Sequence, residues 1–346
     1  MSGLAESKDW SDKIDALLRD MPLVPRMATI LVTLRCNSHC FYCNFGRSDN
    51  TASELPADVV LRRIGQVRRA GIREVCFTGG EPLTWAPLVD VLTETSNQGM
   101  RATLLTNGTL LTGLRLRELI SAGLGMVVIS LDSLDPRTYR EHRGLNIAPV
   151  LRALELLVEA RERHEGFGFI ATSVVTPETL GSAARFALEL EARGVTVQFQ
   201  PVHGHEPALS GPDPQVDANV ESIVALVVPR GAVINHPEYL RHIPKFFETG
   251  RPPAGLPCLA GYLYLLIDLE GEVRICNRME SLGNADKDDL AAMLTGDLAR
   301  TIRERMIRQE CPGCWLLCSG QPVLERLSPY LSALHATWES HQGDRA

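Results

Sequence analysis

The sequence predicts an α/β fold built on a parallel sheet, followed by a small cysteine-rich extension. Six apolar stretches, most of them rich in β-branched residues, alternate with amphipathic helical stretches between residues 27 and 210. Strict alternation of this kind favours a parallel sheet with right-handed crossovers. Eight of the nine cysteines fall into two groups, one near each end of the chain, and such grouping indicates metal ligation.

The first predicted strand, residues 28–34, is a nearly continuous apolar run, as expected of a strand buried on both faces. The other strands are predicted at residues 74–78, 102–106, 126–131, 169–176 and 195–202. Helical periodicity predicts helices at residues 55–70, 87–98, 111–122, 147–163 and 178–193. Gly123 and Gly194 stand where two of these helices end, which is the usual position of a C-cap glycine.

Composition restricts the classes of partner and the compartment. Hydrophobic residues make up 45% of the 346 residues, and the net charge of −7 predicts no basic face for nucleic acid or anionic lipid. No apolar run reaches the ~20 residues of a membrane span. The lead-in, residues 1–26, is polar at its start and has no apolar signal region. We therefore expect a cytoplasmic protein with no membrane partner, in which the cysteines stay reduced.

Cys36, Cys40 and Cys43 lie close together, directly after the first predicted strand. Three thiolates on one tight loop can point at a single centre, and soft sulfur ligands favour zinc or an iron–sulfur cluster. A structural zinc site normally has four protein ligands, so three ligands indicate a metal centre with one open position. His39, inside the loop, is the local candidate for a fourth ligand, and a zinc loop is the alternative interpretation.

The C-x3-C-x2-C spacing resembles that of the radical SAM enzymes. In that family the three cysteines hold a [4Fe-4S] cluster by three of its irons, and the fourth iron binds the amino and carboxylate groups of S-adenosylmethionine (SAM). Tyr42 matches the family's aromatic residue, which packs near the adenine. The resemblance implies that the six strand–helix units of residues 27–210 form an open, TIM-like (β/α)6 barrel.

In a parallel sheet, sites belong at the carboxyl ends of the strands, and the next motifs lie there. Gly79 and Gly80 follow the second strand and remove side chains so that backbone can approach a ligand. Glu81 supplies an acceptor for a cation. By resemblance to the family's GGE motif, that cation is the methionine ammonium of SAM, whereas an ordinary turn is the alternative.

Four further SAM contacts are expected from the third and fourth strands. Asn107, Ser130 and Asp132 offer hydrogen-bonding groups, and the family's ribose contacts come from the fourth strand. Asp132 has an alternative role as the N-cap of a helix at residues 135–140. Arg143 stands where relatives place an arginine that binds the SAM carboxylate, and a solvated arginine at a helix end is its alternative.

The sixth strand ends in a polar segment at the mouth of the proposed barrel. Polar groups that converge on a cavity are candidates for substrate binding, although a solvated loop is the alternative for each of them. The candidates are Gln198, Gln200, His203, His205 and Glu206.

A helical connector, residues 211–250, leads to the extension, residues 251–346. Its cysteines flank a predicted hairpin at residues 262–268 and 272–276 and then form a C-x2-C pair. Four thiolates make a closed soft site, and a zinc ribbon is one alternative. The pattern C-x9–15-G-x4-C followed by C-x2-C resembles the SPASM/twitch extension of radical SAM enzymes, which holds auxiliary [4Fe-4S] clusters. The expected ligands of one auxiliary cluster are Cys258, Cys276, Cys311 and Cys314, with Cys318 a substitute ligand or a free thiol.

The resemblance implies an enzyme that reductively cleaves SAM to a 5′-deoxyadenosyl radical, with electrons from a reductase such as flavodoxin or ferredoxin. Twitch-type relatives dehydrogenate, decarboxylate or epimerise small polar metabolites such as sugars, aminocyclitols and nucleosides in natural-product biosynthesis. SPASM relatives commonly modify ribosomally made peptides. One auxiliary cluster and a short N-terminal lead-in favour the small metabolite.

A SPASM-type peptide maturase is the first alternative, and a zinc-stabilised binding module without chemistry is the second. An epimerase would need a thiol that returns hydrogen to the substrate, and Cys318 or Cys76 can fill that role. We expect Cys76 to face the core from the second strand.

Overall fold

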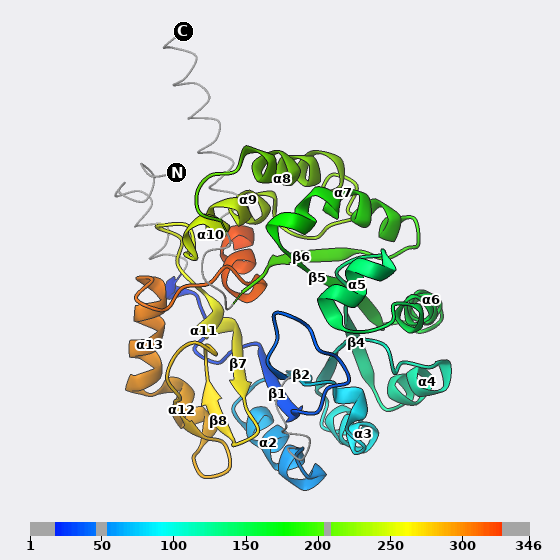
Figure 1. Cartoon of the computed structure of the whole chain (residues 1–346). Helices are drawn as coiled ribbons and strands as arrows, with labels where there is room; N and C mark the ends of the chain where they lie inside the picture. The colour runs from blue at the N-terminus through cyan, green and yellow to red at the C-terminus, as the bar shows by residue number, and fades with distance from the viewer. Residues whose placement is uncertain (1–17, 46–53, 204–208, 327–346) are drawn as a thin grey trace.

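The computed structural model describes residues 18–45, 54–203 and 209–326 (Figure 1). Its strands form one sheet in the order β6-β5-β4-β3-β2-β1-β7-β8-β9. The first six pair in parallel with their chain neighbours, which confirms the predicted α/β partial barrel. They are β1 (Met27–Thr33), β2 (Glu74–Gly79), β3 (Arg101–Thr106), β4 (Leu124–Ser130), β5 (Gly168–Val175) and β6 (Val197–Pro201).

Helices cover the outer face of these strands, as Figure 1 shows. They are α2 (Ala57–Arg69), α3 (Leu88–Asn97), α4 (Gly113–Ser121), α5 (Pro136–Arg143), α6 (Ala148–Arg163) and α7 (Pro177–Glu191), with a short 3-10 helix, η2 (Pro82–Thr84), after β2. In α2, Val60, Ile64 and Val67 lie on one buried face, and this spacing places all three against the sheet.

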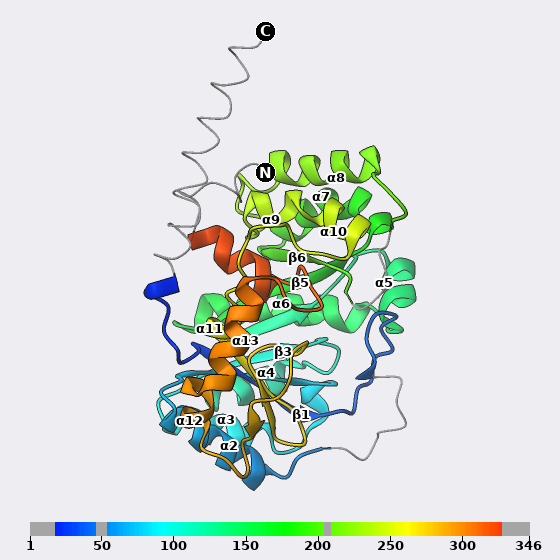
Figure 2. The same ribbon diagram turned by 90° about the vertical axis from the view of Figure 1, so that its left-hand side faces the viewer.

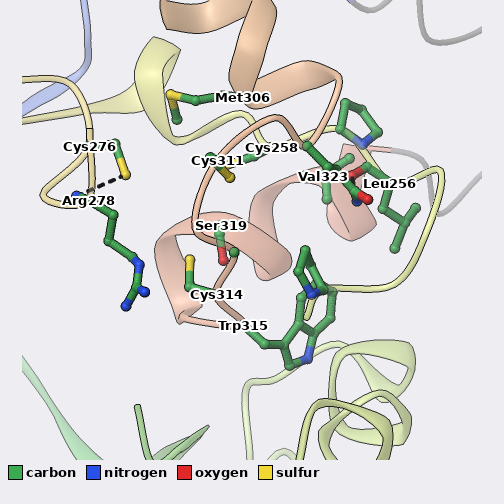
Figure 3. Close-up of a pocket in the computed structure, with 14 residues that line it drawn as sticks. Leu256, Cys258, Cys276, Arg278, Met306, Cys311, Cys314, Trp315, Ser319 and Val323 are labelled. Carbon is green, nitrogen blue, oxygen red and sulfur yellow. Dashed lines mark hydrogen bonds between the residues drawn. The ribbon is translucent and has the colours of Figure 1, made fainter. Parts of the chain in front are cut away.

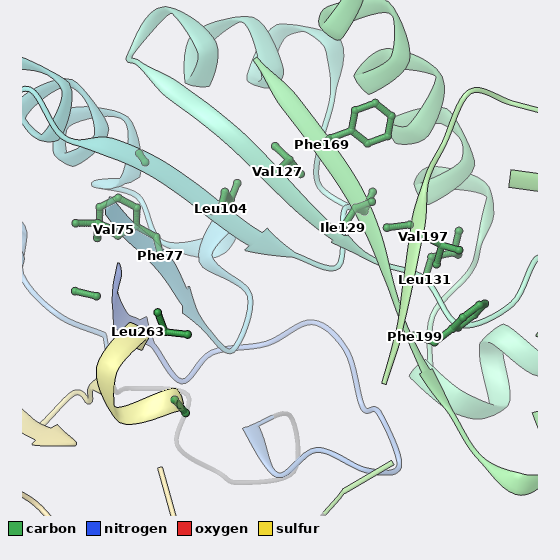
Figure 4. Packing of buried hydrophobic residues seen from close by; sticks show 14 of the residues in the cluster. Val75, Phe77, Leu104, Val127, Ile129, Leu131, Phe169, Val197, Phe199 and Leu263 are labelled. Atoms are coloured by element: carbon green, nitrogen blue, oxygen red, sulfur yellow. The ribbon is translucent and has the colours of Figure 1, made fainter. Parts of the chain in front are cut away.

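The two-residue period of the strands separates an outer, apolar face from an inner, more polar one. Val75, Phe77 and Ile129 point outwards and are fully buried against the helices (Figure 4). Cys76 and Gln198 alternate with such residues and line the interior of the barrel. The outer layer therefore supplies the hydrophobic core, and the inner face is left to form a site.

The helix that follows β4 is capped by a residue other than the one considered from sequence. The side chain of Asp135 accepts a hydrogen bond of 2.8 Å from the amide of Thr138 and is the N-cap of α5. Asp132 therefore has no capping role. The helix ends at Gly144, whose φ of 67° is the left-handed conformation typical of a C-cap glycine.

Beyond the barrel, α8 (Pro214–Leu226), α9 (Pro237–Arg241) and α10 (Ile243–Thr249) form the connector, stacked beside α7 in Figure 2. The extension begins with α11 (Ala260–Leu263) and continues with β7 (Tyr264–Ile267), β8 (Glu272–Arg274) and β9 (Gly283–Asn284), then α12 (Leu290–Thr295) and α13 (Asp297–Ile307). The predicted hairpin is present as the antiparallel pair β7–β8. Gly296 separates α12 from α13.

The extension is continuous with the barrel. Strand β7 pairs in parallel with β1, so the hairpin adds to the same sheet. The buried guanidinium of Arg63, on α2, also reaches the extension. It donates to both carboxylate oxygens of Asp286 and to the backbone carbonyls of Asp268 and Leu269. No helix within the described residues is long and apolar enough to cross a membrane.

Candidate functional site

A cavity of about 380 Å³ opens at the carboxyl ends of the barrel strands. Most of the residues predicted to bind the cluster, SAM or substrate line it together, although they come from six different segments of the chain. These lining residues are Cys36, Cys40, Tyr42, Cys43, Gly79, Gly80, Glu81, Asn107, Ser130, Arg143, Gln198 and Gln200. The topology of the sheet therefore places at one edge residues that span 165 positions of the sequence.

The three cysteines of the first loop line this cavity, and Ser38 contacts the thiols of two of them. The amide of Ser38 donates to Cys36 Sγ at 3.4 Å, and its hydroxyl lies 3.1 Å from Cys40 Sγ. Burial raises the pKa of Cys36 to about 11, and the nearby Glu81 and the other two cysteines contribute, against the opposing effect of the Ser38 amide. A bound metal would lower the pKa of this thiol again, because metal binding favours the thiolate.

The donor set of this loop fits a centre with one open position. Within the described residues, neither a histidine nor a fourth cysteine lines the cavity. His39 is exposed on the loop and lies outside the lining, while its backbone amide donates to the carbonyl of Arg143 at 3.1 Å. A [4Fe-4S] cluster held by three cysteines would leave the remaining iron facing the cavity.

The glycine pair at the end of β2 is required by the chain's own backbone. A Cβ on Gly79 would lie 2.2 Å from the carbonyl oxygen of Thr33, and one on Gly80 would lie 2.1 Å from that of Arg35. The amides of Gly80 and Glu81 donate to the same two oxygens at 2.7 Å each. We expected the glycines to admit a ligand, but the close neighbour is the backbone that leads into the cysteine loop.

Glu81 is buried and already holds three hydrogen bonds from the protein. Its carboxylate accepts from the amide of Leu83, the hydroxyl of Thr106 and the amide of Asn107, at 2.7 to 3.0 Å. Burial raises its pKa, and these donors oppose the rise. A carboxylate has about four lone-pair sites, so roughly one is left for a ligand in the cavity. Much of its role is to hold the loop that follows β3.

Asn107 and Ser130 both line the cavity but differ in whether their side chains remain free to bind a ligand. The side chain of Asn107 donates to Asn37 on the cysteine loop at 2.8 Å and accepts from Thr109. It therefore fixes the loop. The hydroxyl of Ser130 has no hydrogen-bond partner among the described residues and faces the cavity.

Asp132 does not line the cavity. Its buried carboxylate accepts hydrogen bonds from Tyr42 Oη at 2.7 Å, Arg143 Nη2 at 2.7 Å and the amide of Val174 at 2.9 Å. The structure thus gives Asp132 a role other than the predicted ribose contact: it anchors the aromatic residue and the arginine that do line the cavity. The guanidinium carbon of Arg143 lies over the ring of Tyr42, 5.8 Å from the centroid of that ring.

Arg143 retains a buried, unpaired donor for a ligand. Burial opposes its charge, but the carboxylate of Asp132 and the neighbouring Tyr42 raise the pKa of the guanidinium above its usual value. Its Nε is buried and has no hydrogen-bond partner among the described residues. A buried, unpaired N–H of a charged group is costly unless a ligand completes it. This donor suits the carboxylate of SAM, the partner predicted from sequence.

A second cavity, of about 610 Å³, lies deeper in the barrel and reaches the extension. It shares five lining residues with the first: Leu105, Val128, Gln198, Gln200 and Leu317. The two cavities therefore adjoin across the glutamines of β6. Cys76 faces the second cavity from the barrel, and burial raises the pKa of its thiol to about 12.

The four cysteines of the extension that we predicted as ligands lie around a common cavity (Figure 3). Cys258, Cys276, Cys311 and Cys314 line one cavity, together with Trp315. Cys318 is absent from that lining and instead lines the deeper cavity of the barrel. All nine cysteines lie in the described residues, and none forms a disulfide. No three His, Cys, Asp or Glu side chains in the described ranges are close enough to surround a single metal ion.

The remaining substrate candidates lie elsewhere. His203 is outside both barrel cavities: its ring stacks on Phe246, with centroids 6.0 Å apart, and contacts Arg278 of the extension. His205 and Glu206 fall outside the described residues. Sequence reasoning missed Ser38, the loop serine that contacts two thiols, and Arg278, which lies beside the auxiliary cysteines. Neither belongs to a spacing pattern, so only the fold reveals them.

Comparison with known proteins adds two family matches. Residues 30–187 match the radical SAM superfamily, and residues 258–315 match the SPASM iron–sulfur cluster-binding domain. Proteins named probable GTP 3′,8-cyclase are similar in sequence. That of Methanopyrus kandleri is 32% identical over 206 residues, which are 56% of this chain and 64% of that protein. That of Sulfurisphaera tokodaii is 27% identical over 294 residues, 81% of this chain and 88% of that protein.

The chain thus spans just under two thirds of the first of these relatives, and 46% of a relative from Methanococcus maripaludis. Solved structures share the fold at low sequence identity. SuiB of Streptococcus suis bound to precursor peptide SuiA superposes with a TM-score of 0.61 at 16% identity, covering 86% of this chain and 70% of SuiB. The protein anSMEcpe with bound AdoMet gives a TM-score of 0.63 at 15% identity, covering 90% and 96%.

Family, fold and donor sets agree. The radical SAM domain carries a [4Fe-4S] cluster that binds SAM, and the SPASM domain carries auxiliary iron–sulfur chemistry. The cysteine loop and the extension offer the thiols for both. This chain is an enzyme that belongs to the radical SAM superfamily and bears a C-terminal SPASM domain.

Proposed function

We propose that the enzyme abstracts a hydrogen atom from a small, neutral, hydroxyl-rich metabolite, such as a sugar, an aminocyclitol in its uncharged form or a nucleoside, bound between the two barrel cavities. Dehydrogenation or epimerisation in natural-product biosynthesis would be the outcome. When bound, the cluster and SAM supply a 5′-deoxyadenosyl radical. The chain's own residues hold SAM, orient the substrate and exclude water.

The observation that carries this proposal is the pair of glutamines on β6. Gln198 and Gln200 both line the junction of the two cavities, and neither side chain has a hydrogen-bond partner among the described residues. Each primary amide offers two donors and an acceptor in fixed directions. Leu105, Val128 and Leu317 surround them with apolar surface. A few free polar groups in an apolar wall are typical of a site for a small polar ligand.

Charge supports a neutral substrate. Among the described residues that line the two cavities, the arginines are Arg143 and Arg274, and each is paired with a carboxylate, Asp132 and Asp268 respectively. A triphosphate such as the GTP in the relatives' names needs unpaired cationic groups. A peptide substrate is the alternative, and the match to the SPASM domain supports it.

The test is substrate-dependent formation of 5′-deoxyadenosine by anaerobically reconstituted enzyme with a chemical reductant. We expect stimulation by one of a panel of neutral sugars, aminocyclitols and nucleosides. Gln198→Ala and Gln200→Ala should each reduce the stimulated rate about 10-fold, the effect of one lost hydrogen bond of about 1.4 kcal/mol. Cleavage of SAM without substrate should not change.

Gln215→Ala is the matched control, because the side chain of this exposed glutamine on α8 donates to Asn219 and lies outside the linings of both cavities. It should leave the stimulated rate unchanged. Stimulation by GTP alone, or by peptides alone, would contradict the proposal. So would normal stimulation in both β6 variants.

A further inference from the structure

The cavity lined by the auxiliary cysteines contains one positively charged side chain among the described residues, that of Arg278. Its backbone amide donates to Cys276 Sγ at 3.5 Å, as the dashed line in Figure 3 shows. The other polar side chains of the lining are engaged with backbone. Gln309 donates to the carbonyls of Pro253 and Leu256, and Ser319 donates to that of Leu316.

The guanidinium of Arg278 is held without a counter-charge. No carboxylate lies within 4.0 Å of it in the described part of the chain. Its Nη1 lies 3.2 Å from the ring nitrogens of His203, whose ring is fixed by stacking on Phe246. Its Nε is buried and has no acceptor among the described residues. Burial of an unpaired charge is unfavourable unless a negative group completes the site.

An iron–sulfur cluster bound by four thiolates is such a group. It carries net negative charge, and its charge becomes more negative on reduction. A fixed cation beside it therefore stabilises the reduced form more than the oxidised form, and this raises the reduction potential. Hydrogen bonds to the sulfurs, here from the amide of Arg278, act in the same direction.

We infer that Arg278 is a positioning residue that raises the reduction potential of the auxiliary cluster held by Cys258, Cys276, Cys311 and Cys314. His203, two residues after the end of β6, contacts the guanidinium and orients it, which connects the strand that carries Gln198 and Gln200 to the auxiliary site. The inference requires that ligand set but does not depend on which substrate the enzyme uses.

The test is a potentiometric titration of the reconstituted holoenzyme, followed by the electron paramagnetic resonance of its reduced clusters. The signal that changes on addition of SAM belongs to the barrel cluster, and the other belongs to the auxiliary cluster. Arg278→Gln should lower the midpoint potential of the auxiliary cluster alone. Arg278→Lys, which keeps the charge, should remain closer to the wild-type potential.

Arg305→Gln is the charge-matched control, because this arginine on α13 is paired with Glu280 at the surface. It should change neither potential. Loss of auxiliary iron in Arg278→Gln with retention in Arg278→Lys would also support the inference. An unchanged potential in Arg278→Gln, or equal effects of Gln and Lys on potential or iron content, would overturn it, because the charge would then have no role.

Discussion

The carboxylate of Asp132 joins three parts of the chain through hydrogen bonds from the cysteine loop, from α5 and from β5. Its side chain is fully buried and that of Arg143 is 6% exposed. A buried ion pair is costly to break, because the charge that remains is left without compensation. This single residue therefore sets the position of the cavity wall that we assign to SAM.

Replacement of Asp132 tests this assignment. Asp132→Asn should reduce the free energy of unfolding by about 3 kcal/mol, since it leaves Arg143 unpaired, and should weaken SAM binding through Tyr42 and Arg143. Unfolding by denaturant and equilibrium dialysis with SAM measure the two effects. Asp135→Asn, at the exposed N-cap of α5, is the control and should leave SAM affinity unchanged. Equal SAM affinity in the two variants would contradict the role of Asp132.

The glycine pair gives a second prediction at the scale of residues. Gly80→Ala places a Cβ where the carbonyl oxygen of Arg35 stands, 2.1 Å away. The cysteine loop must then shift, so we expect loss of the barrel cluster, about half of the ~8 irons of two [4Fe-4S] clusters. Iron analysis after reconstitution measures this. Gly113→Ala, whose Cβ would meet its nearest neighbour at 3.4 Å, should retain the full iron content. Full iron in Gly80→Ala would contradict the geometry.

Among the elements, the connector helices α9 and α10 support the auxiliary site from the barrel side. Tyr239 on α9 stacks on Trp315, and its hydroxyl donates to the carbonyl of Trp315 at 2.9 Å. The ring of His242, between the two helices, meets the same tryptophan edge-on at 5.6 Å. The segment after Cys314 is therefore packed against helices that belong to the connector.

This packing predicts a pH dependence of stability. Burial lowers the pKa of His242 to about 4, whereas an unfolded histidine has a pKa of about 6.5. The unfolded state therefore binds the proton more readily between these values, and the free energy of unfolding falls as the pH drops. The loss between pH 7.5 and 5.5 should be about 1.3 kcal/mol.

Thermal unfolding under anaerobic conditions, followed by tryptophan fluorescence, measures this dependence. His242→Gln removes the contribution of this histidine to the pH dependence of stability. The decline in melting temperature between the two pH values should therefore be smaller than in the wild type. Identical declines in the two proteins would exclude His242 as the source.

At the scale of the whole molecule, the barrel and the extension are joined by one continuous sheet and by the hydrogen bonds of one buried arginine. Arg63 is 1% exposed and donates to the hairpin and to Asp286. Strand β1, which precedes the cysteine loop, is hydrogen-bonded to β2 on one side and to β7 on the other. The auxiliary site is therefore held at a defined position relative to the barrel.

Arg63→Met should loosen this connection. Loss of the buried hydrogen bonds should cost about 2 kcal/mol and should increase amide hydrogen exchange in residues 264–290 before it affects residues 101–130. Mass spectrometry of the exchange measures both regions. Arg62→Met, at the exposed neighbour paired with Asp58, is the matched control and should exchange like the wild type. Equal exchange of the two regions in Arg63→Met would contradict a local connection.

Much of this organisation is predictable from sequence, because it depends on local patterns. The six barrel strands lie within a few residues of their predicted bounds, since apolar runs separated by amphipathic helices determine them. The cysteine spacings predict both sites. The pairing of β7 with β1 is not predictable in this way, because it joins segments over 230 residues apart.

The roles of single polar residues are also beyond sequence patterns. Asp132 was expected to contact the ribose, but it lies outside the cavity lining and accepts hydrogen bonds from Tyr42, Arg143 and the amide of Val174. His203 was expected at the barrel mouth, but its ring packs on Phe246 and contacts Arg278. Such partners come from distant elements, and only the tertiary fold decides which donor meets which acceptor.

The central claim is that Cys36, Cys40 and Cys43 hold a cluster on which SAM is bound and cleaved. The most direct test incubates anaerobically reconstituted enzyme with SAM and dithionite and measures 5′-deoxyadenosine by chromatography. The account predicts that the wild type forms this product and that a variant with alanine at all three positions forms none, although it keeps its auxiliary iron. Absence of the product from iron-loaded wild type, or its formation by the alanine variant, would contradict the account.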